Sequence, residues 1–218
     1  MENVYRRNCF FIGRPAGRGT VVGDTLYVAT LEIPQNGTGE GFVYAVNRLN
    51  GNIYWKSLLP SDPPFLGGSL NATCAWHNLL FIGSGNSRVY ALTVDSGLVK
   101  WTFMATQAIH TDCLAEDGIV YVGSLNNDFY ALDALTGELR WQYKTLGSIE
   151  HCPPSIEGNI VTFSSSDGFL YGLDRNNGRL LFKYANSFNP ILRASRLYFG
   201  GNNNGGTQYF IKAVQIYK

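Results

Sequence analysis

The feature that most constrains this chain is a unit of about 41 residues that recurs at least four times. In each copy a tyrosine is followed eleven residues later by a large aromatic ring, and a glycine stands four residues before that ring. The tyrosine–ring pairs are Tyr44 and Trp55, Tyr90 and Trp101, Tyr130 and Trp141, and Tyr171 and Phe182. A fifth copy begins at Ile211. We therefore expect equivalent structural units that pack against their neighbours in series.

Each unit is predicted to form four short β-strands. In the third unit they span Ile109–Ala115, Ile119–Ser124, Asp128–Asp133 and Glu138–Lys144. The breaks between them fall at Asp-Gly, Asn-Asn and Thr-Gly pairs, which tolerate the positive φ of tight turns. Four strands in about 40 residues predict an all-β fold, a β-propeller of four-stranded antiparallel blades. The 25 glycines and the 15% of charged residues agree with a turn-rich all-β chain.

One copy carries a recognisable motif. Residues 131–141, ALDALTGELRW, resemble the tryptophan-docking motif A-x-D-x-x-T-G-x-x-x-W of quinoprotein-like (PQQ-like) repeat propellers. The copies ending at Trp55 and Trp101 match with conservative changes, and the copy ending at Phe182 is the weakest. The resemblance implies that each ring docks against the neighbouring blade and that the Asp/Thr pair stabilises the turn. It therefore favours a turn role over a catalytic role for Asp133 and Asp174.

The repeat spacing predicts one domain over residues 1–218 with five blades. Their expected ranges are about 12–58, 69–104, 108–145, 148–185, and 188–218 together with 4–10. The last blade lacks an outer strand, which we expect Val4–Phe10 to supply so that a monomeric ring closes. In that alignment Arg6 takes the place of the docking ring. The alternative is a fragment of a larger propeller, which would form oligomers through its open blades.

Departures from the repeat gather at connections predicted to share one face. They are Leu31–Gly41, Leu59–Ser69 and Gly201–Thr207. Since function is often carried by variable loops on a rigid scaffold, this face is the predicted ligand face. Its candidate lining residues are Phe65, Asn202, Asn203 and Asn204. The alternative is that these loops only decorate the surface.

The innermost strands carry a second group of candidates, His110, Asp112 and His151. Cys74, Cys113 and Cys152 occupy nearly equivalent positions on three consecutive inner strands. Thiolate and imidazole ligands suggest a metal site at the channel mouth. Strand alternation, however, points Cys113 away from His110 and Asp112, so we favour thiols packed between blades and expect no metal. His77 is expected to be exposed at a turn on the opposite face.

Charge and hydropathy exclude several kinds of partner. The net charge of +1 gives no general attraction to nucleic acid. No apolar run reaches the roughly 18 residues of a membrane span. Met1–Arg14 contains no hydrophobic signal-peptide core, although the family resemblance implies a periplasmic or secreted location.

The expected function is a non-catalytic scaffold that presents one loop-rich face to a protein or peptide partner. The alternative is a propeller that binds a small molecule or a glycan through the same face. A dehydrogenase dependent on pyrroloquinoline quinone (PQQ) would, by resemblance, need a vicinal disulfide, calcium ligands and a catalytic aspartate. The sequence has no Cys-Cys pair, so we expect neither PQQ nor calcium. No catalytic or cofactor-binding residue is assigned.

Overall fold

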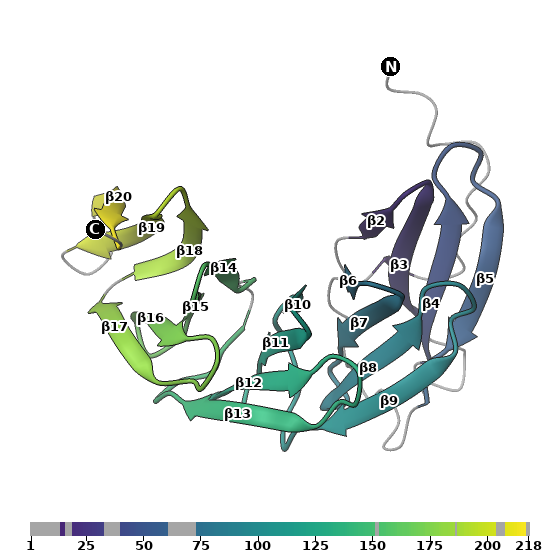
Figure 1. Ribbon diagram of the computed structural model, residues 1–218, viewed down its shortest axis with the longest axis horizontal. Helices are drawn as coiled ribbons and strands as arrows, with labels where there is room; N and C mark the ends of the chain where they lie inside the picture. The colour runs from purple at the N-terminus through teal and green to yellow at the C-terminus, as the bar shows by residue number, and fades with distance from the viewer. Residues whose placement is uncertain are drawn as a thin grey trace.

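The computed structural model describes residues 14–15, 19–32, 40–60, 73–150, 153–185, 187–203 and 208–216. Twenty strands in these residues form five antiparallel sheets, which follow one another along an open arc (Figure 1). Sheet 1 contains β1 (Arg14–Pro15), β2 (Thr20–Val22), β3 (Thr25–Glu32), β4 (Glu40–Asn47) and β5 (Ile53–Leu58). Both β1 and β2 pair with β3, so together they form its inner edge.

The other four sheets repeat the same order from the inside of the arc to the outside. Sheet 2 contains β6 (Cys74–Trp76), β7 (Leu79–Gly83), β8 (Arg88–Thr93) and β9 (Val99–Met104). Sheet 3 contains β10 (Leu114–Glu116), β11 (Ile119–Gly123), β12 (Asp128–Asp133) and β13 (Leu139–Lys144). Sheet 4 contains β14 (Ser155–Glu157), β15 (Ile160–Ser164), β16 (Phe169–Asp174) and β17 (Leu180–Ala185). Sheet 5 contains β18 (Ser187–Arg193), β19 (Arg196–Asn203) and β20 (Gln208–Gln215).

We call the strands of each sheet A to D from the inside outward. The all-β fold and the four-stranded antiparallel units predicted from the repeat are confirmed. The predicted turn residues are also confirmed in the third unit, where Asp117, Gly118, Asn127 and Gly137 all have positive φ. Among the described residues, no helix is long and apolar enough to cross a bilayer.

The predicted strand A of the third unit is too long. The prediction covers Ile109–Ala115, whereas β10 covers only Leu114–Glu116. The reason is that a side chain replaces the backbone ladder: the Thr111 hydroxyl donates to Gly123 O at 3.2 Å and accepts from Gly123 N at 2.7 Å. Further along, Ile109 N donates to Ser84 O of the preceding sheet. The inner segment is therefore tied between two sheets and does not form a regular strand.

Alternation along the strands builds a core between each pair of neighbouring sheets. Leu80 and Ile82 point toward sheet 1, whereas Phe81 between them points toward sheet 3. Four apolar clusters result, one at each of the four boundaries. Because the three middle sheets bury both faces, the repeats stabilise one another in series.

The docking expected from the motif is present at three boundaries. Trp55, Trp101 and Trp141 donate their indole N–H to the backbone oxygens of Val94, Ala134 and Arg175 at 3.1, 3.0 and 2.9 Å. Each ring also lies over the motif glycine of the next sheet. A Cβ at Gly137 would be only 2.6 Å from Trp101 Cδ2 and Cε3. The glycine is therefore needed both for its φ of 76° and for the approach of the ring.

The fourth ring behaves differently. Phe182 has no N–H to donate, and it lies over Gly172 of its own sheet, where a Cβ would be 2.2 Å from Phe182 Cζ. Gly172 pairs directly with Phe182 across strands C and D. The equivalent residues in sheets 1 to 3 are alanines that face a tryptophan. The glycine of this weakest copy makes room for its own ring.

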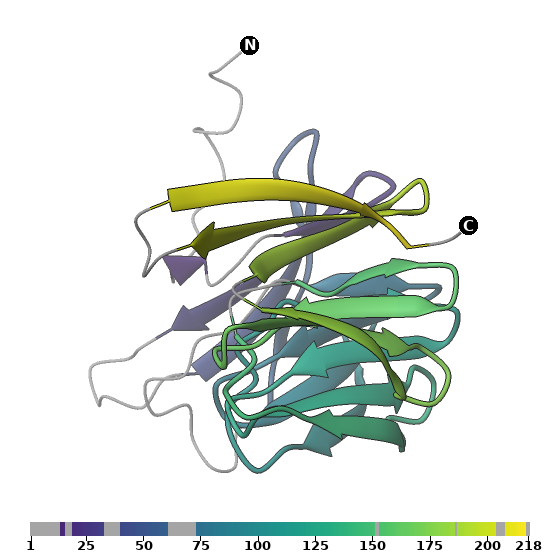
Figure 2. The same cartoon turned by 90° about the vertical axis from the view of Figure 1, so that its left-hand side faces the viewer.

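In the described residues, no strand D covers strand C of sheet 5. Ile211 in β20 is 87% exposed, whereas its counterparts Val43, Val89, Phe129 and Leu170 are all 0% exposed. Within the described residues β20 pairs only with β19 (Figure 2). Val4–Phe10, predicted to form the missing outer strand, lies outside the described residues. Ring closure, the blade ranges and the number of blades therefore stay predictions.

Candidate functional site

The polar residues of the docking motif are used within the repeat. Asp133 Oδ1 accepts from the backbone N–H groups of Leu135 and Thr136 at 2.9 and 3.0 Å. Its Oδ2 forms an ion pair with Arg140 at 2.7 Å. The Arg140 hydrogen bond, with further backbone donors, lowers the pKa of the Asp133 carboxyl despite partial burial. Asp174 Oδ1 accepts from Asn176 N in the same way. These contacts agree with the turn role predicted for both aspartates.

Most residues of the predicted ligand face lie outside the described residues. Phe65, His151 and Asn204 lie there, together with most of the three irregular loops. The prediction of a loop at Asn202 and Asn203 is wrong for their backbone. Both belong to β19, because the β19–β20 ladder continues through Asn202–Tyr209 and Asn203–Gln208 pairs. The loop-rich ligand face therefore stays a prediction.

The inner-strand candidates are only partly brought together. His110 and Asp112 are half-buried in the segment that precedes β10. His110 forms a parallel bridge with Glu150 of the next sheet. Cys113 points away from them, since its thiol donates to Phe81 O of sheet 2 at 3.3 Å. Of the residues in the described ranges, no group of three His, Cys, Asp or Glu side chains could hold a metal ion.

The two described thiols belong to the apolar core between sheets 2 and 3. Cys74 packs against the cluster that contains buried Cys113. Burial raises the pKa of the Cys74 thiol well above its usual range, and the Cys113 thiol and the Asp112 charge raise it further. A buried thiol with a raised pKa holds little thiolate, the form that binds metals or attacks disulfides. These observations favour a packing role for the pair.

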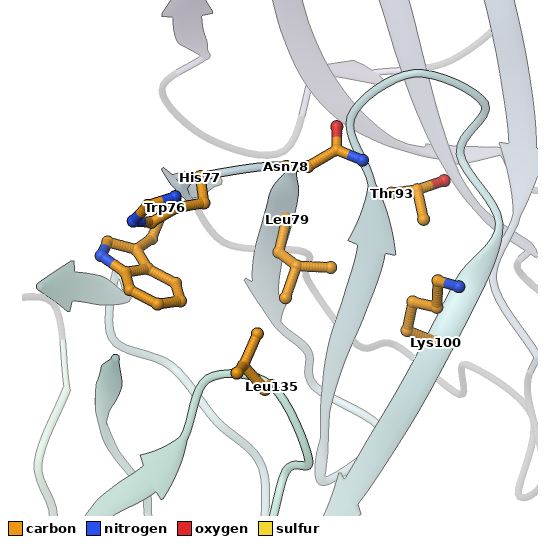
Figure 3. Close-up of a pocket in the computed structure, with 7 residues that line it drawn as sticks. All are labelled: Trp76, His77, Asn78, Leu79, Thr93, Lys100 and Leu135. Atoms are coloured by element: carbon orange, nitrogen blue, oxygen red, sulfur yellow. The ribbon is translucent and has the colours of Figure 1, made fainter. Parts of the chain in front are cut away.

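The described residues form a groove between sheets 2 and 3, on the face opposite the predicted ligand face. It has a volume of about 550 Å³ and is lined by Trp76, His77, Asn78, Leu79, Thr93, Lys100 and Leu135 (Figure 3). Sheet 2 contributes all of these except Leu135, which comes from the C–D turn of sheet 3. Trp76 and His77 lie at the inner end of the groove, and Lys100 lies at the outer end. We call this the turn-face groove.

Its inner wall is an aromatic pair. The rings of Trp76 and His77 meet edge to face with centroids 4.2 Å apart. Trp76 also reaches the A–B turn of sheet 3, where a Cβ at Gly118 would be 3.7 Å from Trp76 Cη2. His77 is exposed, as predicted. The opposite wall, Leu135, is 66% exposed, so both apolar walls are open to solvent.

Lys100 at the outer end lacks the partner that the repeat provides elsewhere. In sheet 3 the equivalent pair is the Asp133–Arg140 ion pair, and in sheet 1 Asn47 Nδ2 donates to Tyr54 OH at 2.6 Å. In sheet 2 the position of the aspartate is taken by Thr93, whose hydroxyl contacts Ser96 Oγ and Leu98 N. Within the described parts of the chain, the ammonium group of Lys100 has no hydrogen-bond or ion-pair partner.

The neighbouring boundary shows what is particular to this groove. A cavity of about 260 Å³ lies in the equivalent place between sheets 1 and 2. There Asp95 replaces Leu135, and the hydrogen-bonded Tyr54 replaces Lys100. Of these two spaces, the one between sheets 2 and 3 is larger and more apolar. It also contains Lys100, which no described side chain neutralises.

Sequence reasoning did not find this groove. It placed only His77 at an exposed turn, and it did not consider Lys100 or Leu135. A signal was available in the aligned repeats. Asp133 and Arg140 of the third copy align with Thr93 and Lys100 of the second copy. Because threonine replaces the aspartate, Lys100 lacks the carboxylate that pairs with Arg140 in sheet 3.

Comparisons with known proteins agree with this architecture. The family model described as outer membrane protein assembly factor BamB matches residues 39–197. The chain belongs to the BamB family. A search of curated proteins found no match. The BamB fold is also seen in the structural comparisons, as BamB from Moraxella catarrhalis aligns with a TM-score of 0.54 at 14% identity, covering 92% of this chain and 76% of that one.

Two further solved structures share the BamB-like propeller fold. The computationally designed Ika4 protein aligns with a TM-score of 0.59 at 15% identity, over 74% of this chain and 91% of its own. Quinohemoprotein alcohol dehydrogenase from Comamonas testosteroni aligns with a TM-score of 0.69 at 14% identity, over 87% of this chain and 40% of its own. These likenesses show the fold, and together with the family model they confirm the predicted quinoprotein-like repeat propeller.

In this BamB-family chain the motif aspartates and the described cysteines make structural contacts. The motif aspartates that could supply ligands already accept turn hydrogen bonds, and Asp133 also pairs with Arg140. The two described cysteines carry reduced thiols and lie in different sheets, and the sequence contains no adjacent cysteine pair.

Proposed function

We propose that this BamB-family chain is a non-catalytic scaffold that binds a protein or peptide partner. The observation that carries the proposal is the contrast between its polar and apolar side chains. The polar groups shared by the repeats serve turns and docking, whereas the apolar turn-face groove stays open to solvent. An open apolar surface rimmed by polar residues is typical of a protein-binding site.

Family membership supports the same proposal. The matching model is described as an outer membrane protein assembly factor, and an assembly factor acts by contact with other proteins. The rigid arrangement of the sheets also suits a scaffold, because packing between repeats fixes the surfaces at each boundary. The loop-rich face predicted from the sequence would offer a second surface for such contacts.

A second candidate is binding of a small molecule or a glycan. The volume of the turn-face groove, about 550 Å³, lies within the range of small-molecule sites. Its exposed lining is mostly apolar, although His77, Asn78, Thr93 and Lys100 also border it. This composition suits an apolar side chain better than the hydroxyl groups of a sugar.

The proposal is tested by chemical crosslinking of the full chain in its own cells, followed by purification under denaturing conditions. A scaffold should yield one or a few crosslinked proteins at reproducible stoichiometry, and the purified pair should reassociate. In parallel, the purified chain is mixed with PQQ and calcium and assayed for quinone absorbance and alcohol-dependent dye reduction. A quinone spectrum with dye reduction and no protein partner would overturn the scaffold. A glycan hit without a protein partner would support the second candidate.

A further inference from the structure

The turn-face groove combines two features that together specify a ligand. At the inner end, Trp76 and Leu79 offer apolar surface, and Leu135 faces them from sheet 3. At the outer end, Lys100 carries a charge that no described side chain neutralises. A ligand that complements both ends has an apolar group beside a carboxylate.

We propose that the turn-face groove binds an extended peptide segment in which a leucine or aromatic residue is followed or preceded closely by an acidic residue. The apolar side chain enters between Trp76 and Leu135, and the carboxylate pairs with Lys100. This inference rests on the proposed scaffold function and assigns it a surface. That surface is opposite the loop-rich face predicted from the sequence.

The size of the groove supports one anchoring side chain with adjacent backbone. A cavity of about 550 Å³ exceeds what a single leucine or phenylalanine fills, so it can also admit part of the flanking chain. The groove between sheets 1 and 2 is about 260 Å³ and has Asp95 where this one has Leu135. That carboxylate would repel an acidic peptide, so the neighbouring boundary is not an equivalent site.

Charge complementarity identifies Lys100 as the specificity residue. The equivalent Arg140 in sheet 3 is held by Asp133 at 2.7 Å. Because Thr93 cannot neutralise Lys100, an acidic residue on the ligand gains a partner without breaking one. Both Lys100 and Leu135 are exposed, so substitutions there should leave the fold intact.

The test begins with a random-peptide phage library panned against the full chain. Wild-type protein should enrich peptides that combine Leu, Phe or Trp with Asp or Glu. Lys100→Glu should enrich peptides in which a basic residue replaces the acidic one. An enriched peptide, synthesised with fluorescein, is then titrated by fluorescence anisotropy. We expect Leu135→Ser to weaken it about tenfold or more, because burial of an apolar side chain is lost. We expect Lys100→Glu to weaken it by about fivefold or more.

Leu146 provides the matched control. It is 88% exposed in a connection between sheets 3 and 4, on the loop-rich face. Leu146→Ser should leave peptide affinity unchanged, and thermal unfolding should be the same for all three variants. The proposal is overturned if Lys100→Glu and wild-type protein enrich the same peptides, or if Leu135→Ser binds as tightly as Leu146→Ser.

Photo-crosslinking in cells separates this proposal from the scaffold itself. A photoreactive residue is placed at position 135 in one chain and at position 146 in another. A partner captured from position 135, and lost with Lys100→Glu, supports the groove. A partner captured only from position 146 overturns the groove but keeps the scaffold. Failure to capture any protein from either face, with no enriched peptide, contradicts both.

Discussion

The substitution Gly137→Ala tests the docking of neighbouring sheets most sharply. The new methyl group would be 2.6 Å from Trp101 Cδ2 and Cε3, well inside van der Waals contact. The residue would also adopt a φ of 76°, which costs an L-amino acid roughly 1–2 kcal/mol. Displacing a packed ring adds about 1–3 kcal/mol. We therefore expect a loss of about 2–5 kcal/mol in the free energy of unfolding.

Gly168→Ala is the matched control, because it separates backbone strain from the ring clash. Gly168 has a φ of 86°, but nothing lies within 4 Å of the position that a Cβ would take there. It should lose only the strain of about 1–2 kcal/mol. The measurement is urea unfolding followed by circular dichroism, which does not depend on the Trp101 fluorescence.

A double-mutant cycle then assigns the remainder to the ring. In a Trp101→Ala background, Gly137→Ala should cost about as little as Gly168→Ala, giving a coupling of about 1–3 kcal/mol. Equal losses for both glycine variants in the wild-type background, or a coupling near zero, would refute the docking argument.

Three further predictions concern residues of sheet 4. Gly172→Ala should destabilise the chain by about 1–3 kcal/mol, because its methyl group displaces Phe182; an unchanged urea midpoint would contradict this. Arg175→Met should cost about 1–2 kcal/mol in the same assay, because buried Arg175 forms two ion pairs at 3.1 Å with the partly exposed A–B turn of sheet 3. Burial, then a hydrogen bond to a carboxylate, raises the pKa of Tyr171. The contribution of Tyr171 to stability should therefore be constant below about pH 10 and fall above it, because the unfolded tyrosine ionises first. Tyr171→Phe should reduce that slope between about pH 9 and pH 11, and parallel curves would argue against it.

The repeat made much of the architecture predictable. Four copies with one spacing identify the blade, and positive-φ residues such as Asn127 identify its turns. The docking of Trp101 followed from resemblance to the family motif. These features are local or periodic, so a single sequence records them directly.

Features that depend on side-chain contacts made only in the folded chain could not be predicted in this way. The Thr111 hydroxyl replaces a backbone ladder, and its pattern resembles that of any strand threonine. The turn-face groove joins Trp76 to Leu135 across two repeats, so its shape exists only after the sheets pack. Only the loss of a partner for Lys100 left a trace, in the alignment of the repeats.

The last sheet has three strands within the described residues, and the central question of the architecture is what pairs with its strand C. Strand C of every other sheet is covered by a strand D, whereas Ile211 of β20 is 87% exposed. We propose that Val4–Phe10 supplies the missing strand, which would bring the two ends of the arc in Figure 1 together. In the repeat alignment, Cys9 takes the position of Lys144 and Phe210 takes that of Asp128. Because Lys144 pairs with Asp128 across strands C and D of sheet 3, Cys9 would lie opposite Phe210.

Oxidation of the Phe210→Cys variant tests this closure most directly. The account predicts an intramolecular disulfide between Cys9 and the introduced thiol in monomeric protein, identified by peptide mass mapping. Ile211→Cys, whose side chain points to the other face of the sheet, should crosslink far less. A disulfide that forms only between chains, or none at all, would contradict closure and favour a piece of a larger propeller.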